Sequence, residues 1–372
     1  MRKITFISIV TILCMIFLSA CGGQSSSSGT TPSTGTTGST TQNTNSESQQ
    51  AETKADPIIL KVADSFPSGH YIPEHGTKPW MEEITEKTNG RVTFEYYPSE
   101  QLGKLSDLLD LLKRGTVDIA YVPPAFNQGK MPLSQVVTLP SLFNLSVTGT
   151  KAYMELADKE PILTTDYLNN DIRHMWGAMT APYNVATVNK PVQTLDDLQG
   201  MILKTGGGIQ DQITMALGAS GINIPSPETY ESMERGTVNG AIFPLSSVKG
   251  YRVNEVAKYY TEGFDITVFY APYAINEKVW QSLPEEIRTV FLEANQKYSM
   301  VIAEFTDRET ATLKKQFEEE GMTFFTLPEE DKVKVKEKLD PIIQTWIEQT
   351  EAQGYKAKEV YDAFTSAIQE NQ

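Results

Sequence analysis

Short apolar runs alternate with amphipathic stretches through the first half of this 372-residue chain. Runs rich in Ile, Val and aromatic residues, bounded by Gly, Pro or Asn, predict strands at 58–65, 92–97 and 117–122. Between these runs, helical periodicity places apolar residues on one face at 80–88 and 105–112. Strands that alternate with helices in this way predict an α/β fold with parallel or mixed sheets.

The same alternation returns in the second half of the chain. Strands are predicted at 172–179, 183–188, 201–205, 221–224, 238–243 and 270–275. Helices are predicted at 194–198, at 227–233 and from the glycine run 206–208 to about 217, and the chain is mostly helical after 284. This alternation suits two lobes, because the globular part of the chain is too large for one minimal hydrophobic core. The expected first lobe is 57–181 plus about 269–308, and the second is 182–268 plus about 309–372.

A ten-residue phrase occurs twice, at 114–123 and 235–244. Each copy follows a helical stretch, turns at a Gly, continues as an apolar strand and stops at Pro123 or Pro244. Ligands of open α/β sheets collect beyond the carboxyl ends of the strands, so both Pro residues and Phe243 are expected to face a cleft. We expect the positions at which the copies differ to bear on the choice of ligand, such as Asp118 against Asn239 and Tyr121 against Ile242.

The N-terminus predicts export. Two basic residues precede an apolar run at 4–18, which is too short to span a membrane and is typical of a signal peptide at 1–20. The sequence Leu18-Ser19-Ala20-Cys21-Gly22 resembles a bacterial lipobox with Cys21 as the lipidated residue. The alternative is an ordinary secretory signal with a chance Cys. After Cys21, residues up to 56 are mostly Ser, Thr, Gly, Gln and Asn, so 21–56 is predicted to be the lipidated Cys followed by a disordered linker.

Composition narrows the function further. The net charge of −15 argues against a nucleic-acid partner, which needs a basic surface. Of two Cys, only Cys21 would remain after signal removal, so no intrachain disulfide is expected. The sequence has no nucleophile elbow, zinc-protease or phosphate-loop motif, and we expect neither an enzyme nor a cofactor or metal.

Several segments in order resemble the solute-binding proteins of TRAP (tripartite ATP-independent periplasmic) transporters, the class that includes C4-dicarboxylate uptake. They are the lipobox, 66–70, 88–92, 97–103, both copies of the repeated phrase, 217–219 and 280–284. The resemblance implies a two-lobed periplasmic-binding-protein-like fold, with mixed sheets flanked by helices. A hinge of crossing strands and a long helix would let the lobes close over an organic acid.

The resemblance also implies an anchor for the ligand. Family members commonly hold the carboxylate with an Arg on a strand of the second lobe, in a pattern similar to Lys-Ile-Arg-Thr-Pro-Gly-Gly. Here the Arg position holds Lys204, which is a point charge rather than a planar fork. The alternative is a strand-end Lys exposed to solvent.

Other candidate ligand residues follow from position and residue type. Aromatic walls are expected from Phe66, Tyr71, Phe126, Tyr183 and Phe243, although core packing is the competing interpretation of each. His70 lies in the loop after the first strand, and its alternative is a structural role. Gly206 opens a helix whose free N–H groups bind anions, and the alternative there is a plain tight turn.

These observations predict an extracytoplasmic binding protein, lipid-anchored through Cys21, that passes a small solute to the membrane subunits of a TRAP permease. The expected ligand is a monocarboxylate with an apolar or aromatic body. The alternatives are a neutral polar solute, and a sensor that presents its closed form to a receptor. We expect a monomer.

Overall fold

The computed structural model describes residues 56–372. The predicted signal peptide 1–20, Cys21 and all but the last residue of the predicted linker 21–56 lie outside the described residues. Within 56–372, no helix is long and apolar enough to cross a membrane.

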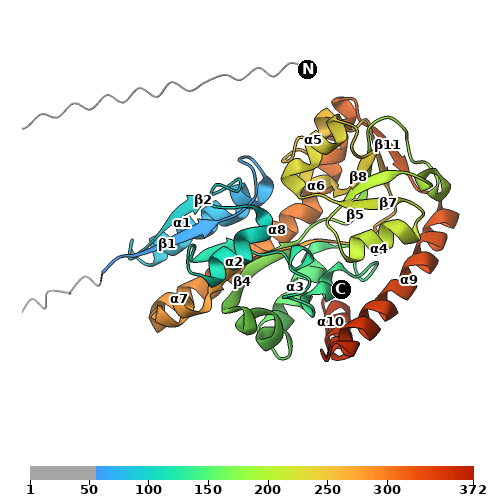
Figure 1. Cartoon of the computed structure of the whole chain (residues 1–372). Helices are drawn as coiled ribbons and strands as arrows, with labels where there is room; N and C mark the ends of the chain where they lie inside the picture. Colours follow the sequence, from blue (N-terminus) through green and yellow to red (C-terminus); the bar gives the residue numbers. More distant parts are fainter. Residues whose placement is uncertain (1–55) are drawn as a thin grey trace, which may run out of the picture. The chain divides into compact units, whose positions relative to one another are not determined.

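The described part is built on two mixed sheets (Figure 1). The first sheet has the order β2-β1-β3-β10-β4, and β10 runs antiparallel to β3 and β4. Its strands are β1 (Ile58–Ala63), β2 (Val92–Tyr97), β3 (Ile119–Tyr121), β4 (Ile172–Met179) and β10 (Tyr270–Asn276). The predicted α/β class with mixed sheets is confirmed.

The second sheet has the order β11-β9-β5-β8-β6-β7. In it β6 runs parallel to β7 and β8, whereas β5 runs antiparallel to β8 and β9. Its strands are β5 (Tyr183–Thr187), β6 (Ile202–Thr205), β7 (Ser220–Asn223), β8 (Gly240–Pro244), β9 (Tyr259–Glu262) and β11 (Thr323–Thr326). The chain therefore passes from the first sheet to the second after β4 and returns after β9.

Helices cover both sheets (Figure 1). They are α1 (Lys78–Lys87), α2 (Leu108–Lys113), α3 (Ser146–Ala157), α4 (Ile209–Ala216), α5 (Thr229–Glu234), α6 (Leu245–Val248), α7 (Glu277–Ser282), α8 (Glu285–Glu319), α9 (Glu329–Ala352) and α10 (Ala357–Glu370). The 35-residue α8 contacts β4 and α1 beside the first sheet, and α6 and β11 beside the second. One continuous helix thus supports both halves.

The last helix differs from the sequence prediction. Residues 309–372 were expected in the second lobe, and α9 does pack against α4. However, α10 packs against α3 beside the first sheet, where Phe364 meets Phe143 and Tyr153 edge-on at 6.0 and 6.3 Å between ring centroids. An apolar helical stripe does not specify which sheet it will cover, so this assignment of α10 was wrong.

Candidate functional site

A small cavity of about 20 Å³ lies where the two sheets approach one another. It has room for about one water molecule. The first sheet, its loops and the returning strand supply Phe66, Ile72, Tyr121, Thr180, Phe269 and Ala271. The second sheet and its loops supply Tyr183, Ser226, Phe243, Ser247 and Tyr251. Both halves of the molecule therefore contribute walls.

The walls are aromatic. Phe66 lies 4.5 Å from Tyr121 between ring centroids, both from the first-sheet side. On the other side, Phe243 meets Tyr251 edge-on at 5.7 Å and lies 6.4 Å from Tyr183. These rings give the cavity flat, apolar faces, which suit a planar apolar body.

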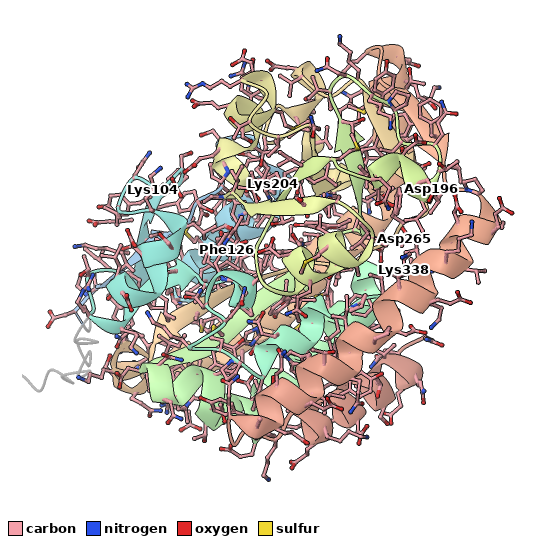
Figure 2. The ribbon with its side chains drawn as sticks, turned by 45° about the vertical axis from the view of Figure 1, so that its right-hand side comes forward. Lys104, Phe126, Asp196, Lys204, Asp265 and Lys338 are labelled. Atoms are coloured by element: carbon pink, nitrogen blue, oxygen red, sulfur yellow. The ribbon has the colours of Figure 1, made fainter. Side chains whose placement is uncertain are left out.

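Lys204 is not one of the residues that line this cavity, but it lies next to the lining residue Phe243. Its Nζ lies 5.2 Å from the Phe243 ring centroid, and its side chain is buried, with only 2% of its surface exposed. Figure 2 shows Lys204 on its strand near the centre of the view, with Phe126 on the segment that follows β3. Strand β6 places Lys204 beside Ala241 of β8 and Ile222 of β7, so neighbouring strands enclose it from both sides.

The ammonium of Lys204 has no hydrogen bond or ion pair with any residue of 56–372, and burial alone lowers its pKa to about 7. A buried charge without a partner is costly, and the usual responses are to find a counter-ion or to lose the charge. The solvent-exposed alternative for Lys204 is wrong. Its contact with a ligand remains a prediction.

A second buried ionisable group, Asp64, lies just after β1. It accepts hydrogen bonds from the hydroxyls of Tyr96 and Tyr273, each at 2.6 Å, and from the Phe66 N–H at 3.0 Å. Burial raises the pKa of Asp64 to about 6, and these hydrogen bonds oppose that rise. Asp64 thereby fixes the loop that carries Phe66 and His70.

The other candidate residues divide into two groups. Phe66, Tyr183 and Phe243 line the cavity. His70 stacks on Phe66 at 4.7 Å and Tyr71 stacks on His70 at 4.7 Å, so both lie behind the first wall. Phe126 meets the cavity residue Phe269 edge-on at 6.0 Å.

Two expectations about backbone positions remain predictions, and the contacts made there by the described residues are structural. The N–H of Gly206 donates to Gln210 Oε1 at 2.6 Å, so this N–H is already paired, as the tight-turn interpretation requires. Pro123 and Pro244 are not among the residues that line the cavity. The Pro123 carbonyl instead accepts from Asn127 Nδ2 at 2.9 Å and shapes the turn that carries Phe126.

Sequence reasoning missed four lining residues in particular: Thr180, Ser247, Tyr251 and Phe269. Ser247 lies in the short helix α6, and the other three lie in loops or at strand ends without a recognisable motif. Tyr121, in contrast, is a position at which the two copies of the repeated phrase differ, and it does line the cavity.

Larger hollows lie elsewhere on the surface, and the largest, of about 530 Å³, lies between α3 and α8. It is open to solvent and takes its lining from the first-sheet side only. The described residues contain no cluster of His, Cys, Asp and Glu that could hold a metal. The small aromatic cavity is therefore the better candidate for the ligand site. Residues of both halves line it, and the buried Lys204 lies next to one of them, Phe243.

Comparison with known proteins places the chain among bacterial solute-binding proteins. Residues 64–350 match the profile of a family described as bacterial extracellular solute-binding protein, family 7. The C4-dicarboxylate-binding periplasmic protein DctP of Rhodobacter capsulatus is 27% identical over 304 residues, which cover 77% of this chain and 86% of that protein.

Two solved structures share the fold. A TRAP solute-binding protein from Rhodoferax ferrireducens, in complex with copurified benzoate, aligns with a TM-score of 0.78 at 21% identity, over 84% of this chain and 98% of that one. A marine metagenome TRAP solute-binding protein specific for aromatic acids, in complex with 3-hydroxybenzoate, aligns with a TM-score of 0.79 at 20% identity, over 86% of this chain and all (100%) of that one. At such low identities these matches establish the fold alone.

Proposed function

The chain belongs to family 7 of the bacterial extracellular solute-binding proteins, and we propose that it captures a monocarboxylate with an aromatic or apolar body. The TRAP solute-binding family predicted from the motifs is confirmed, and it is a family of transport proteins rather than enzymes. The class of solute is therefore what we propose.

The observation that carries the proposal is the unpartnered ammonium of Lys204. Within 56–372 the side chain is buried and burial is the one influence on its pKa. A ligand carboxylate would supply the missing counter-ion, and hydrogen bonds to charged groups are stronger than neutral ones. No Lys or Arg of residues 56–372 lines the cavity itself, so the neighbouring Lys204 has no second cation there, which favours a single carboxylate over two.

The aromatic walls support a ring or another flat apolar body next to that carboxylate. Phe66, Tyr121, Tyr183, Phe243 and Tyr251 supply aromatic faces of the kind that enclose small ligands. Structural relatives that hold benzoate and 3-hydroxybenzoate support the same ligand class.

Binding requires the two halves to separate, because a cavity of about 20 Å³ cannot admit an aromatic acid. Few polar contacts join the halves near the site. His70 Nε2 lies 3.3 Å from Ser247 Oγ, and Lys104 Nζ lies 4.0 Å from Glu228 Oε1. A ligand that adds contacts to both halves would shift such an open–closed equilibrium towards closure.

The proposal places the protein outside the cytoplasm, where it delivers its solute to TRAP permease subunits. The family description supports an extracellular location. Lipid anchoring through Cys21 and a monomeric state belong to the proposal, and they rest on the N-terminal sequence and on the family resemblance.

The test is isothermal titration calorimetry of the protein without its first 20 residues, using benzoate, benzamide and phthalate. Benzamide has nearly the shape of benzoate but no charge, and phthalate adds a second carboxylate. We expect benzoate to bind at least tenfold more tightly than either. Equal binding of benzamide and benzoate would rule out the carboxylate anchor and favour a neutral solute.

A further inference from the structure

His70 connects the two halves of the site through one hydrogen bond. It lies in the loop after β1, between Phe66 and Tyr71, with its ring 5.0 Å from that of Tyr251. Only 1% of its surface is exposed. Its Nε2 lies 3.3 Å from Ser247 Oγ of α6, which belongs to the other half.

The proton of the His70 ring can be assigned from its two contacts. The N–H of Ile72 donates to Nδ1 at 3.3 Å, so Nδ1 is an acceptor and carries no proton. Burial lowers the pKa of His70 to about 3, and no acidic side chain of the described chain is bonded to it, so the ring is neutral. A neutral imidazole carries one proton, which must then lie on Nε2. His70 therefore donates to Ser247.

The hydroxyl of Ser247 consequently has its own proton to donate. Ser247 is 5% exposed and lines the aromatic cavity. Among residues 56–372 its one well-formed hydrogen bond is the one with His70, and a weaker contact with the Tyr71 hydroxyl partly opposes the rise in the pKa of Tyr71 that burial causes. A buried hydroxyl proton without an acceptor is unfavourable, and a ligand oxygen at the cavity would accept it.

We propose that Ser247, oriented by His70, is a second binding residue that donates a hydrogen bond to a neutral oxygen of the ligand. The preferred solute is then an aromatic monocarboxylate that carries a hydroxyl group on or beside its ring. This inference rests on the proposed function, because Lys204 must first hold the carboxylate. His70 acts as a positioning residue, since it reaches the ligand only through Ser247.

The experiment measures affinities of benzoate and of the three hydroxybenzoate isomers for the wild type, Ser247→Ala and Ser226→Ala by calorimetry. We expect one isomer to bind the wild type about tenfold more tightly than benzoate, as one added hydrogen bond predicts. Ser247→Ala should remove this preference, so that no isomer binds this variant more tightly than benzoate does. Ser226→Ala is the matched control, because Ser226 also lines the cavity but has no histidine partner, and it should retain the preference.

The role of His70 is tested by His70→Gln, which keeps a donor near the Nε2 position, and His70→Leu, which does not. The preference should survive in the first variant and disappear in the second. A wild type without preference for any isomer, or a Ser247→Ala variant that keeps the preference, overturns the assignment. If benzoate and all isomers fail to bind the wild type, the proposed function fails with it. Benzoate binding without an isomer preference removes the Ser247 inference alone.

Discussion

The two copies of the repeated phrase form the same local structure in different sheets. The first joins α2 to β3, and the second joins α5 to β8. Gly115 and Gly236 both turn the chain with φ of 69°. The first residue of each copy, Arg114 or Arg235, caps its helix through the same kind of backbone hydrogen bond, at 3.2 and 3.0 Å.

The resemblance extends to a position where the sequences differ. Asp118 Oδ2 accepts from the N–H of Lys61 on β1 at 2.8 Å, and Asn239 Oδ1 accepts from the N–H of Ile202 on β6 at 2.7 Å. We expected the change from Asp118 to Asn239 to bear on ligand choice. For this pair the contacts are structural, because either side chain offers the oxygen that ties the strand to its neighbour. A role in ligand choice remains a prediction.

The two units differ in the hydrogen-bond partners of the ionisable residue at the strand end. The registers make Ala63 of β1 the counterpart of Lys204 of β6, since they pair with Ala120 and Ala241 respectively. One residue after Ala63, Asp64 is satisfied by hydrogen bonds from the protein. Lys204 is not satisfied by any described residue. The repeated scaffold therefore carries Asp64, whose hydrogen bonds are structural, and Lys204, for which we propose a ligand partner.

The largest expected effect comes from Asp64→Ala, which leaves two tyrosine hydroxyls and one N–H without their acceptor. Each unsatisfied buried group costs about 1–3 kcal/mol, so the free energy of unfolding should fall by about 3–5 kcal/mol in urea titration. Asp64→Asn keeps an acceptor oxygen and should lose less. A loss below about 1 kcal/mol for Asp64→Ala would show that these contacts do not hold the loop.

Lys204→Met should stabilise the folded protein, unlike Asp64→Ala, and should weaken ligand binding. Benzoate affinity in calorimetry should fall about 100-fold, as loss of a charged hydrogen bond predicts. The melting temperature of the ligand-free protein at pH 6 should rise, because a buried charge without a partner is replaced by an apolar chain. A lower melting temperature would place Lys204, like Asp64, among the structural residues.

Binding should also depend on pH above neutrality. The lysine pKa is lowered to about 7 by burial, so the ammonium that a carboxylate needs is lost as the pH rises through 7. Benzoate affinity should fall by about twofold between pH 6 and 7 and then by up to tenfold per pH unit. Lys204→Arg keeps its charge throughout this range and should bind equally at pH 6 and pH 9. A flat profile for the wild type would contradict the lowered pKa.

The smallest effects should come from the shared turns. In both Gly115→Ala and Gly236→Ala, the added Cβ meets no atom within 4 Å, so the cost is that of a left-handed backbone for Ala. Each variant should lose about 1 kcal/mol of unfolding free energy, with benzoate affinity unchanged. Unequal losses, or a change in affinity for one variant, would mean that the two turns are not equivalent.

Much of the fold was predictable because most strands are short apolar runs with clear boundaries. The predictions at 92–97 and 172–179 coincide with β2 and β4. The strands β9 and β11 were missed, since Tyr259–Glu262 and Thr323–Thr326 contain few aliphatic residues and pair with each other at the sheet edge. Their strand structure depends on that pairing rather than on local sequence.

The site was predictable only in part. Phe66, Tyr183 and Phe243 were identified from their places beside strand ends, and all three line the cavity. Ser247, Tyr251 and Phe269 were not, because they reach the cavity from segments that carry no periodic or motif signal.

The sequence by itself determined the family, the α/β rhythm, the two equivalent turns and the lysine that stands where an arginine is expected. Each of these depends on residues close together in the chain. Only the tertiary structure decided that Lys204 is buried without an anion while Asp64 has three donors, and that His70 faces Ser247. A group's burial and partners depend on every segment packed around it, and those segments lie far apart in the sequence.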